Sequence, residues 1–259
     1  MVQITAYFAT IYKISKFVSM FDLIVSKAYI SHKYDYCKPT IKDPKEWSEW
    51  KGRHHSAFFS AKGLRHPLIE HINTNETYVS NDVSLGKDSY GILLYGTNAV
   101  GKSSLMKSLG LAVIMAQSGM FVSATNFEYY PYKDLFTRIS GNDNIFRGQS
   151  TFAVEMSELR SILKRSNKNS LVLGDELCSG TETVSGLAIV SAGVVTLNNL
   201  NSSFIFATHL HQLSKLEELN QLKRVKNFHM ETIYDSEKDL LIYNRKLKEG
   251  SGNAIYGLE

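Results

Sequence analysis

The chain has 259 residues, of which 43% are hydrophobic and 21% are charged, so it can form one large domain and is too apolar for a disordered tail. Its net charge of +4 is uneven, because residues 1–65 hold 11 Lys and Arg against 5 Asp and Glu. An excess of that size is typical of a solvated face, and any attraction to phosphate backbones would come from this N-terminal part.

Apolar residues recur at three- and four-residue spacing from Ile4 to Val25. This period predicts one long amphipathic helix of about seven turns, which either packs on a partner helix or extends from the main body. A membrane-surface role is disfavoured because its polar face is not strongly basic. Charged residues interrupt every apolar run before it reaches the length of a membrane span, and neither a basic leader nor a cleavage pattern is present.

The two cysteines, Cys37 and Cys178, lie far apart and belong to no paired motif. They therefore offer no framework for disulfides and no zinc site. Together with the absence of a membrane-spanning run, this favours an intracellular protein in a reducing compartment, without distinguishing cytoplasm, nucleus, organelle or viral factory.

Residues 36–62 contain Pro39, Pro44 and Gly52 within a mixed charged stretch, which predicts a linker. We therefore expect a helical segment and linker over residues 1–62 and a second domain over 63–259. In that domain short apolar runs alternate with helical stretches, which predicts an α/β fold with a mostly parallel sheet. The strands expected are Ile92–Tyr95, Ser170–Asp175 and Ser203–Thr208, and the helices are Lys102–Ser118, Thr151–Lys164 and Thr183–Asn198.

A phosphate-binding motif follows the first of these strands. The pattern G-x-x-x-x-G-K-S/T lets glycine backbone N–H groups turn inward around phosphates, and the next helix adds its N-terminal partial charge. Lys102 is placed to reach the β- and γ-phosphates, and the Ser103 hydroxyl is placed to ligate Mg²⁺. The nucleotide-binding residues predicted here are Gly96, Thr97, Asn98, Ala99, Val100, Gly101, Lys102, Ser103 and Ser104.

Two acidic residues follow the second strand, about 70 residues further on. Carboxylates at the carboxyl edge of such a sheet lie where open α/β folds bind ligands. We expect Asp175 to hold Mg²⁺ and Glu176 to act as general base toward the attacking water. His209 ends the third strand, where it can hydrogen-bond the γ-phosphate. These motifs together predict a P-loop NTPase.

The order of the short motifs resembles that of the MutS family of DNA mismatch-repair ATPases, whose ATPase domain belongs to the ABC class. The likeness covers residues 63–258, and residues 1–60 resemble the end of the family's helical core and lever region more weakly. The motifs that carry it are Gly63-Leu64-Arg65-His66-Pro67, Gly96–Ser103, Phe136-Thr137-Arg138-Ile139, Ser150–Met156, Asp175-Glu176, Gly180-Thr181-Glu182-Thr183, Thr208-His209 and Tyr256-Gly257-Leu258.

The resemblance implies composite sites, in which two ATPase domains enclose two nucleotides and each borrows a serine from the other subunit. Ser150 matches that serine, and it would bring a hydroxyl and a helix N-terminus to the γ-phosphate only on dimerisation. Tyr78 and His229 match the two rings that enclose adenine. Cys178-Ser179 replace the family's usual Gly-Arg, which puts a subunit contact in doubt. No Phe-x-Glu mismatch-reading motif occurs, so we expect a fragment, a divided gene product or a reduced relative.

The leading interpretation is a Mg²⁺-dependent ATPase that uses ATP at dimer sites to switch a DNA clamp in mismatch repair. The partners implied are a second ATPase domain, identical or different, and DNA, contacted mostly through regions absent from this chain. One alternative is a nucleotide-dependent interaction module that hydrolyses ATP negligibly alone. Another ABC-class ATPase ranks lower, because neither a Leu-Ser-Gly-Gly-Gln signature nor long coiled-coil heptads occur.

Overall fold

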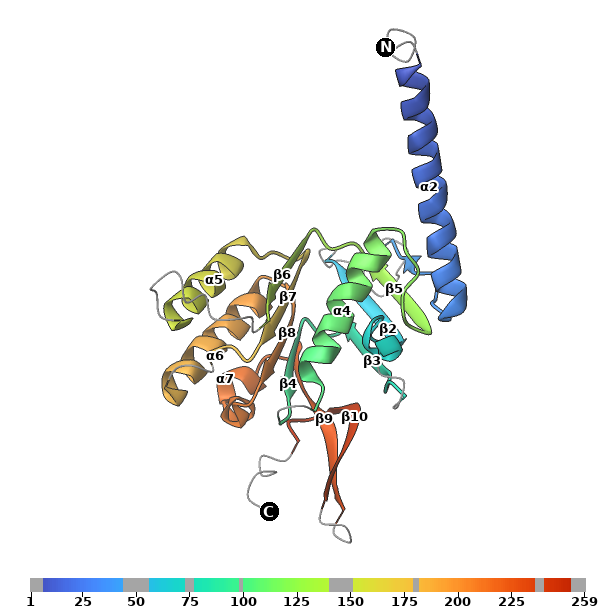
Figure 1. Ribbon diagram of the computed structural model, residues 1–259. Coiled ribbons are helices and arrows are strands. Elements are labelled where there is room, and N and C mark those ends of the chain that lie inside the picture. Colours follow the sequence, from blue (N-terminus) through green and yellow to red (C-terminus); the bar gives the residue numbers. More distant parts are fainter. Residues whose placement is uncertain are drawn as a thin grey trace.

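A large six-stranded sheet forms the centre of the computed structural model, and a smaller four-stranded sheet lies beside it (Figure 1). The structure describes residues 7–43, 56–72, 77–97, 100–139, 151–178, 182–235 and 240–252. Its helices are α2 (Phe8–Lys33), α3 (Ile69–Ile72), α4 (Lys102–Gln117), α5 (Thr151–Arg165), α6 (Thr183–Asn199) and α7 (Glu217–Asn220), with a 3₁₀ helix, η4 (His211–Lys215).

The large sheet has the strand order β10-β9-β4-β8-β7-β6. All neighbouring strands in it are parallel except β9 and β10, which form an antiparallel pair at one edge. The predicted mostly parallel α/β sheet is therefore confirmed. Its strands are β4 (Gly91–Tyr95), β6 (Asp134–Arg138), β7 (Ser170–Asp175), β8 (Ser203–Thr208), β9 (Val225–Asp235) and β10 (Leu240–Glu249).

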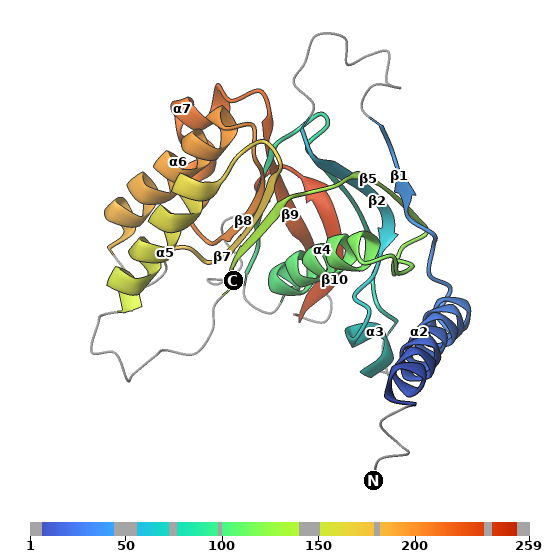
Figure 2. The same cartoon turned by 90° about the horizontal axis from the view of Figure 1, so that it is seen from above.

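Helices cover both faces of the large sheet. Figure 2 shows α5, α6 and α7 together on one side and α4 on the other, between the large sheet and the small one. The burial of β4 on both faces explains why its sequence is continuously apolar. Ile92 and Leu94 belong to the core under α4, whereas Leu93 and Tyr95 belong to the core under α5 and α6. A strand buried on both faces has no polar side to alternate with.

The small sheet has the order β1-β5-β2-β3, with strands β1 (Thr40–Ile41), β2 (Phe58–Leu64), β3 (Asn81–Leu85) and β5 (Asn126–Tyr130). Strand β2 crosses the expected division between residues 62 and 63. Tyr36 is also buried in the core under α4, so the segment after the long helix already packs on the main body.

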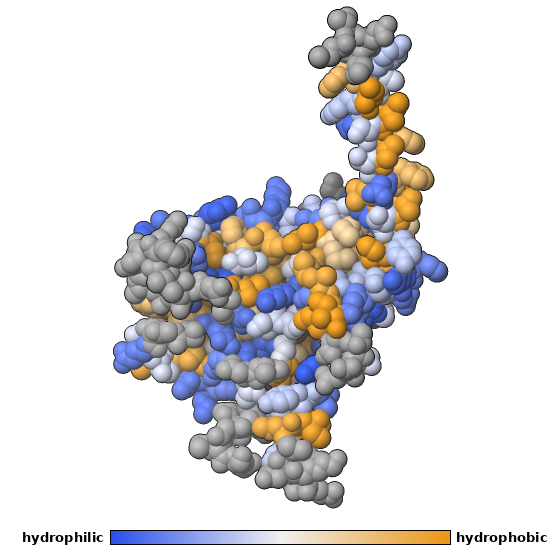
Figure 3. All heavy atoms as spheres, viewed as in Figure 1, coloured by the Kyte–Doolittle hydropathy of each residue, from blue (hydrophilic) through white to orange (hydrophobic). Residues whose placement is uncertain are grey.

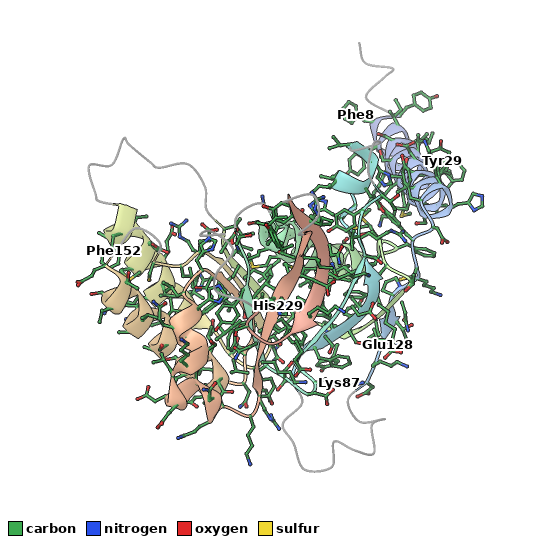
Figure 4. All side chains as sticks on the ribbon, turned by 90° about the horizontal axis from the view of Figure 1, so that it is seen from below. Phe8, Tyr29, Lys87, Glu128, Phe152 and His229 are labelled. Carbon is green, nitrogen blue, oxygen red and sulfur yellow. The ribbon has the colours of Figure 1, made fainter. Side chains whose placement is uncertain are left out.

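The long helix α2 extends away from both sheets (Figure 1). It begins at Phe8 and continues to Lys33, beyond the predicted end at Val25, and none of its residues is buried. Apolar side chains run along its exposed surface in Figure 3, and Phe8 and Tyr29, labelled in Figure 4, are each more than 60% exposed. In the parts of the chain that the structure describes, no helix combines the length and apolarity needed to cross a membrane.

Candidate functional site

The three strands predicted from the sequence end side by side. Tyr95 at the end of β4 pairs with Thr208 at the end of β8, and Asp175 at the end of β7 pairs with Ala207. The glycine-rich loop, the acidic pair and His209 therefore leave the same edge of the large sheet. The carboxyl edge of a parallel sheet is where open α/β folds bind their ligands.

The glycine-rich loop has a backbone that only glycine adopts readily. Gly96 has φ +151°, and a Cβ built there would lie 2.8 Å from Cγ1 of Val100, which is itself fully buried. Gly101 has φ +108° and precedes α4, whose first turn has no side-chain cap. Uncapped N–H groups at a helix start can bind an anion.

The Lys102 side chain folds back into this loop and is only 4% exposed. Its Nζ donates hydrogen bonds to the carbonyl oxygens of Gly96 at 2.6 Å and Thr97 at 2.9 Å. Burial lowers the pKa of Lys102 from its ordinary value, and the carboxylates of Glu176 and Asp175 oppose that shift. The ammonium therefore lies where the loop would surround a phosphate, with two acidic groups nearby.

Asp175 offers an unused oxygen at this edge. Its Oδ1 is buried and has no hydrogen-bond partner within the described part of the chain. A buried carboxylate oxygen without a partner is costly, and a cation would satisfy it. Ser103, the second residue of α4, supplies a half-buried hydroxyl in the loop. Carboxylate and hydroxyl oxygens with phosphate and water are the donor set that Mg²⁺ takes, so these residues fit that ion.

Glu176 and His209 form a direct pair beside Asp175. The His209 Nε2 and Glu176 Oε1 atoms are 2.7 Å apart, and both side chains are partly open to solvent. Glu176 has φ +49°, and its N–H donates to the carbonyl of Ala207 at 2.9 Å. Left-handed backbone costs a non-glycine residue roughly 1–2 kcal/mol, so the surrounding contacts must hold this turn. The carboxylate thereby faces the site, oriented by an imidazole.

The turn after β7 has a further support from α5. Cys178 also has a positive φ, +63°, and its N–H donates to Oε1 of Glu155 at 2.8 Å. Between the two left-handed residues, Leu177 is buried in the core under α5 and α6. The sequence places Glu155 within the motif Ser150–Met156 but gives it no role. Only the folded structure shows that it reaches this turn.

A cavity of about 190 Å³ adjoins the start of α4. It is lined by Tyr78, whose hydroxyl lies 3.2 Å from Oγ of Ser108, and by the predicted nucleotide-binding residue Ser104. Arg245 of β10 lines it as well, at an irregularity in the β9–β10 pairing. Gly101 also lines the cavity, which therefore adjoins the end of the glycine-rich loop.

His229 lies elsewhere. Its neighbour Met230 lines the cavity with Tyr78, and successive residues of a strand point to opposite faces. The His229 Nδ1 atom is 3.0 Å from the carbonyl oxygen of Gly250, and a Cβ on Gly252 would lie 2.9 Å from its ring (Figure 4 labels His229 on β9). The structure therefore brings Tyr78 together with Arg245, and not with His229.

His211 is a histidine that the sequence interpretation did not select. It lies two residues after His209, and its ring stacks on Tyr95 with centroids 5.3 Å apart. Burial lowers its pKa, with smaller contributions from His209, Lys102 and His229. In the sequence, the spacing His209-Leu210-His211 is the feature that indicates a second imidazole near this edge of the sheet.

Three predicted site residues, Asn98, Ala99 and Ser150, lie outside the described residues. The same holds for residues 179–181 and for Tyr256-Gly257-Leu258.

A glycine-rich loop after β4, an acidic pair after β7, which is separated from β4 by β8, and helices on both faces of the sheet define a P-loop NTPase domain. Residues 92–259 match the family model for MutS domain V. The chain therefore belongs to the MutS family.

Similar proteins occur in viruses, mitochondria and bacteria. A mutS homologue of Acanthamoeba polyphaga mimivirus, named as a DNA mismatch repair protein, is 41% identical over 96% of this chain and 24% of the relative. The mitochondrial mutS homologue of Sarcophyton glaucum is 42% identical over 93% of this chain and 23% of the relative. DNA mismatch repair protein MutS of Fusobacterium nucleatum is 33% identical over 99% of this chain and 27% of the relative. The chain thus spans about a quarter of their length.

Proposed function

We propose that this chain binds ATP with Mg²⁺ and hydrolyses it, as the ATPase part of a DNA mismatch-repair protein. The observation that carries this proposal is the meeting of three groups at one sheet edge: the buried Lys102 in its glycine-rich loop, the unpaired Oδ1 of Asp175 and the Glu176–His209 pair. Each is suited to a different part of phosphoryl transfer to water.

Lys102 and the backbone N–H groups of the loop would bind the β- and γ-phosphates. To do so, the Lys102 ammonium exchanges its bonds to the Gly96 and Thr97 carbonyls for bonds to phosphate oxygens, which carry full negative charge. Ser103 and Asp175 would hold Mg²⁺, which neutralises charge on the phosphates. The low exposure of Lys102 and Asp175 strengthens these electrostatic interactions, because little water screens them.

Glu176 would act as the general base. A water oxygen attacks the γ-phosphorus while Glu176 accepts one of its protons, and the bond between the β,γ-bridging oxygen and the γ-phosphorus breaks to give ADP and inorganic phosphate. His209 orients the carboxylate through its 2.7 Å contact and is close enough to the same edge to bind a γ-phosphate oxygen. Proton transfer by a positioned side chain contributes about 10²–10⁴-fold to rate.

The base of the nucleotide would enter the cavity beside Gly101. Tyr78 supplies an aromatic ring and Arg245 a planar guanidinium, both of which can stack on a purine. Ser104 lines the same cavity at the first turn of α4, where it would lie between the base and the phosphates. This arrangement replaces the Tyr78–His229 pair expected from the resemblance.

The wider role rests on the relatives, which are named as DNA mismatch repair proteins. We extend to this chain a cycle in which two ATPase domains close on ATP, Ser150 of one reaching the γ-phosphate bound by the other. Hydrolysis then resets the grip of an intracellular clamp on DNA, contacted through other parts of the assembly. Such a cycle needs a state that exists only while the γ-phosphate is attached.

Steady-state ATP turnover tests the proposal. We expect turnover by the purified chain to rise more than linearly with protein concentration, to fall by about 10²-fold or more in Glu176→Gln, and to vanish in Lys102→Ala. Nucleotide affinity, measured separately, should survive in Glu176→Gln but not in Lys102→Ala. Binding of ATP with no turnover at any concentration would instead support an interaction module that does not hydrolyse ATP.

A further inference from the structure

Glu155 is a buried acidic residue that has no role in the proposed reaction as described above. It lies in the second turn of α5 and is 8% exposed, whereas Glu158 of the same helix is on the surface and pairs with Arg138. Within the described part of the chain, no cation pairs with Glu155. Its hydrogen-bond partner there is the N–H of Cys178, 2.8 Å from Oε1. Burying a charge is unfavourable, so a buried carboxylate with a single backbone donor indicates that its hydrogen bond has a structural or functional role.

That donor belongs to the turn that carries Glu176. Glu176 and Cys178, two residues apart, both have left-handed backbone, which residues with a Cβ adopt rarely. Three contacts oppose relaxation of the turn: the Glu176 N–H on the Ala207 carbonyl, burial of Leu177, and the Cys178 N–H on Glu155. The first two come from the sheet and its core. The third comes from α5, where Glu155 accepts a hydrogen bond from the far end of the turn.

Removing this acceptor would leave a buried N–H without a partner. The cheapest relief is a rotation of the peptide between Leu177 and Cys178, since the left-handed backbone of Glu176 and of Cys178 is itself unfavourable. Such a rotation moves the carboxylate of Glu176 relative to its 2.7 Å contact with His209. Displacement of a reacting group by about 1 Å can cost up to a hundredfold in rate while leaving binding intact.

We propose that Glu155 is a positioning residue that fixes the catalytic orientation of Glu176 by accepting the Cys178 N–H. The proposal rests on the ATPase function proposed above, because it concerns the base of that reaction. It assigns Glu155 an effect on turnover through the turn, with no contact to nucleotide.

A matched pair of variants separates the hydrogen bond from charge and packing. Glu155→Gln keeps a side-chain carbonyl oxygen at the same length, and Glu155→Met keeps the length but has no comparable acceptor. We expect kcat to fall by about tenfold or more in Glu155→Met, with KM for ATP changed by less than about twofold, and to be largely restored in Glu155→Gln. Equal losses in both variants, wild-type kcat in Glu155→Met, or a rise in KM that parallels the loss would each overturn the proposal.

Alkylation of Cys178 by iodoacetamide reports the turn without any turnover. In a Cys37→Ser background Cys178 is the single thiol, and its pKa is raised to about 11, first by burial and then by Glu155. Both variants remove the charge of Glu155, so a difference between them reports the acceptor. We expect alkylation at least several-fold faster in Glu155→Met than in Glu155→Gln.

The two readouts keep the proposals distinguishable. If wild type and Glu176→Gln turn over ATP equally, the ATPase function fails, and faster alkylation of Glu155→Met would still establish that Glu155 holds the turn. Equal alkylation of the two variants would refute the anchoring contact whatever the turnover.

Discussion

The phosphate end and the base end of the proposed nucleotide site are assembled differently. At the phosphate end, Gly96–Ser103 and Asp175-Glu176 are short contiguous segments placed by β4 and β7, two parallel strands that flank β8. At the base end, Tyr78 precedes β3 and Arg245 lies on β10, more than 160 residues away in sequence, so long-range pairing brings them to one cavity. Local sequence therefore determines the first end, and register determines the second.

The largest effect expected from this comparison is at Gly96. Gly96→Ala adds a Cβ 2.8 Å from Val100 Cγ1, in a backbone region that L residues adopt rarely, so the loop cannot keep its curvature. We expect ATP affinity to fall by about a hundredfold, measured by titration calorimetry, since the proposed site uses the backbone N–H groups of this loop to bind phosphate.

Gly193→Ala is the matched control for that change. A Cβ at Gly193 would lie 3.7 Å from its nearest neighbour, and the residue is in the middle of α6, where Ala favours the helix. Affinity should be unchanged and stability equal or higher. Wild-type affinity in Gly96→Ala would show that the phosphate end tolerates local backbone change, contrary to the comparison.

The same contrast explains which features the sequence predicts. The strands β4, β7 and β8 and the helices α4, α5 and α6 match their predicted ranges to within one residue, because continuous apolar runs and helical periods are local signals. The small sheet was not predicted: Phe58 to Leu64 fell partly in the expected linker, and this strand is specified by pairing with β3 and β5.

The base end shows the same limit within the site. The resemblance points to His229 because its position matches a family ring, but whether a side chain enters a cavity depends on which face of β9 it occupies. A change of one residue along a strand reverses that face. Arg245 carries no local motif, and it reaches the cavity where the β9–β10 register shifts between Tyr243 and Leu247. No pattern in the sequence indicates that shift.

A smaller effect is expected at the base end. We expect Arg245→Ala and Tyr78→Ala each to weaken ATP binding by about tenfold, because a stacking contact contributes roughly 1–1.5 kcal/mol. His229→Gln, on the opposite face of β9, should change affinity by less than about twofold. Fluorescent-nucleotide competition measures all three. If His229→Gln weakened binding as much as Arg245→Ala, the assignment of the base to this cavity would be wrong.

The smallest effect concerns how firmly the wall of the base cavity is held. His66 is 5% exposed, and its Nδ1 accepts hydrogen bonds from the N–H groups of Leu68 and Ile69, both at 3.2 Å. Ile69 begins α3 and lines the cavity. Those bonds need Nδ1 unprotonated, and burial, with a smaller effect from Lys107, lowers the pKa of His66 below 6.5.

The sign of the pH dependence follows from that lowered pKa. As pH falls through 6.5 the unfolded chain takes up the proton first, so stability that is complete above pH 6.5 is lost as pH falls toward the lower pKa of the folded chain. His66→Asn keeps an oxygen acceptor that does not titrate in this range. Between pH 7.5 and 5, we expect wild type to lose about 1 kcal/mol more unfolding free energy than His66→Asn in urea titrations. Equal losses would mean that the two N–H bonds do not depend on the protonation state of His66. The wall of the base cavity would then be as insensitive to pH as the glycine-rich loop, which contains no histidine.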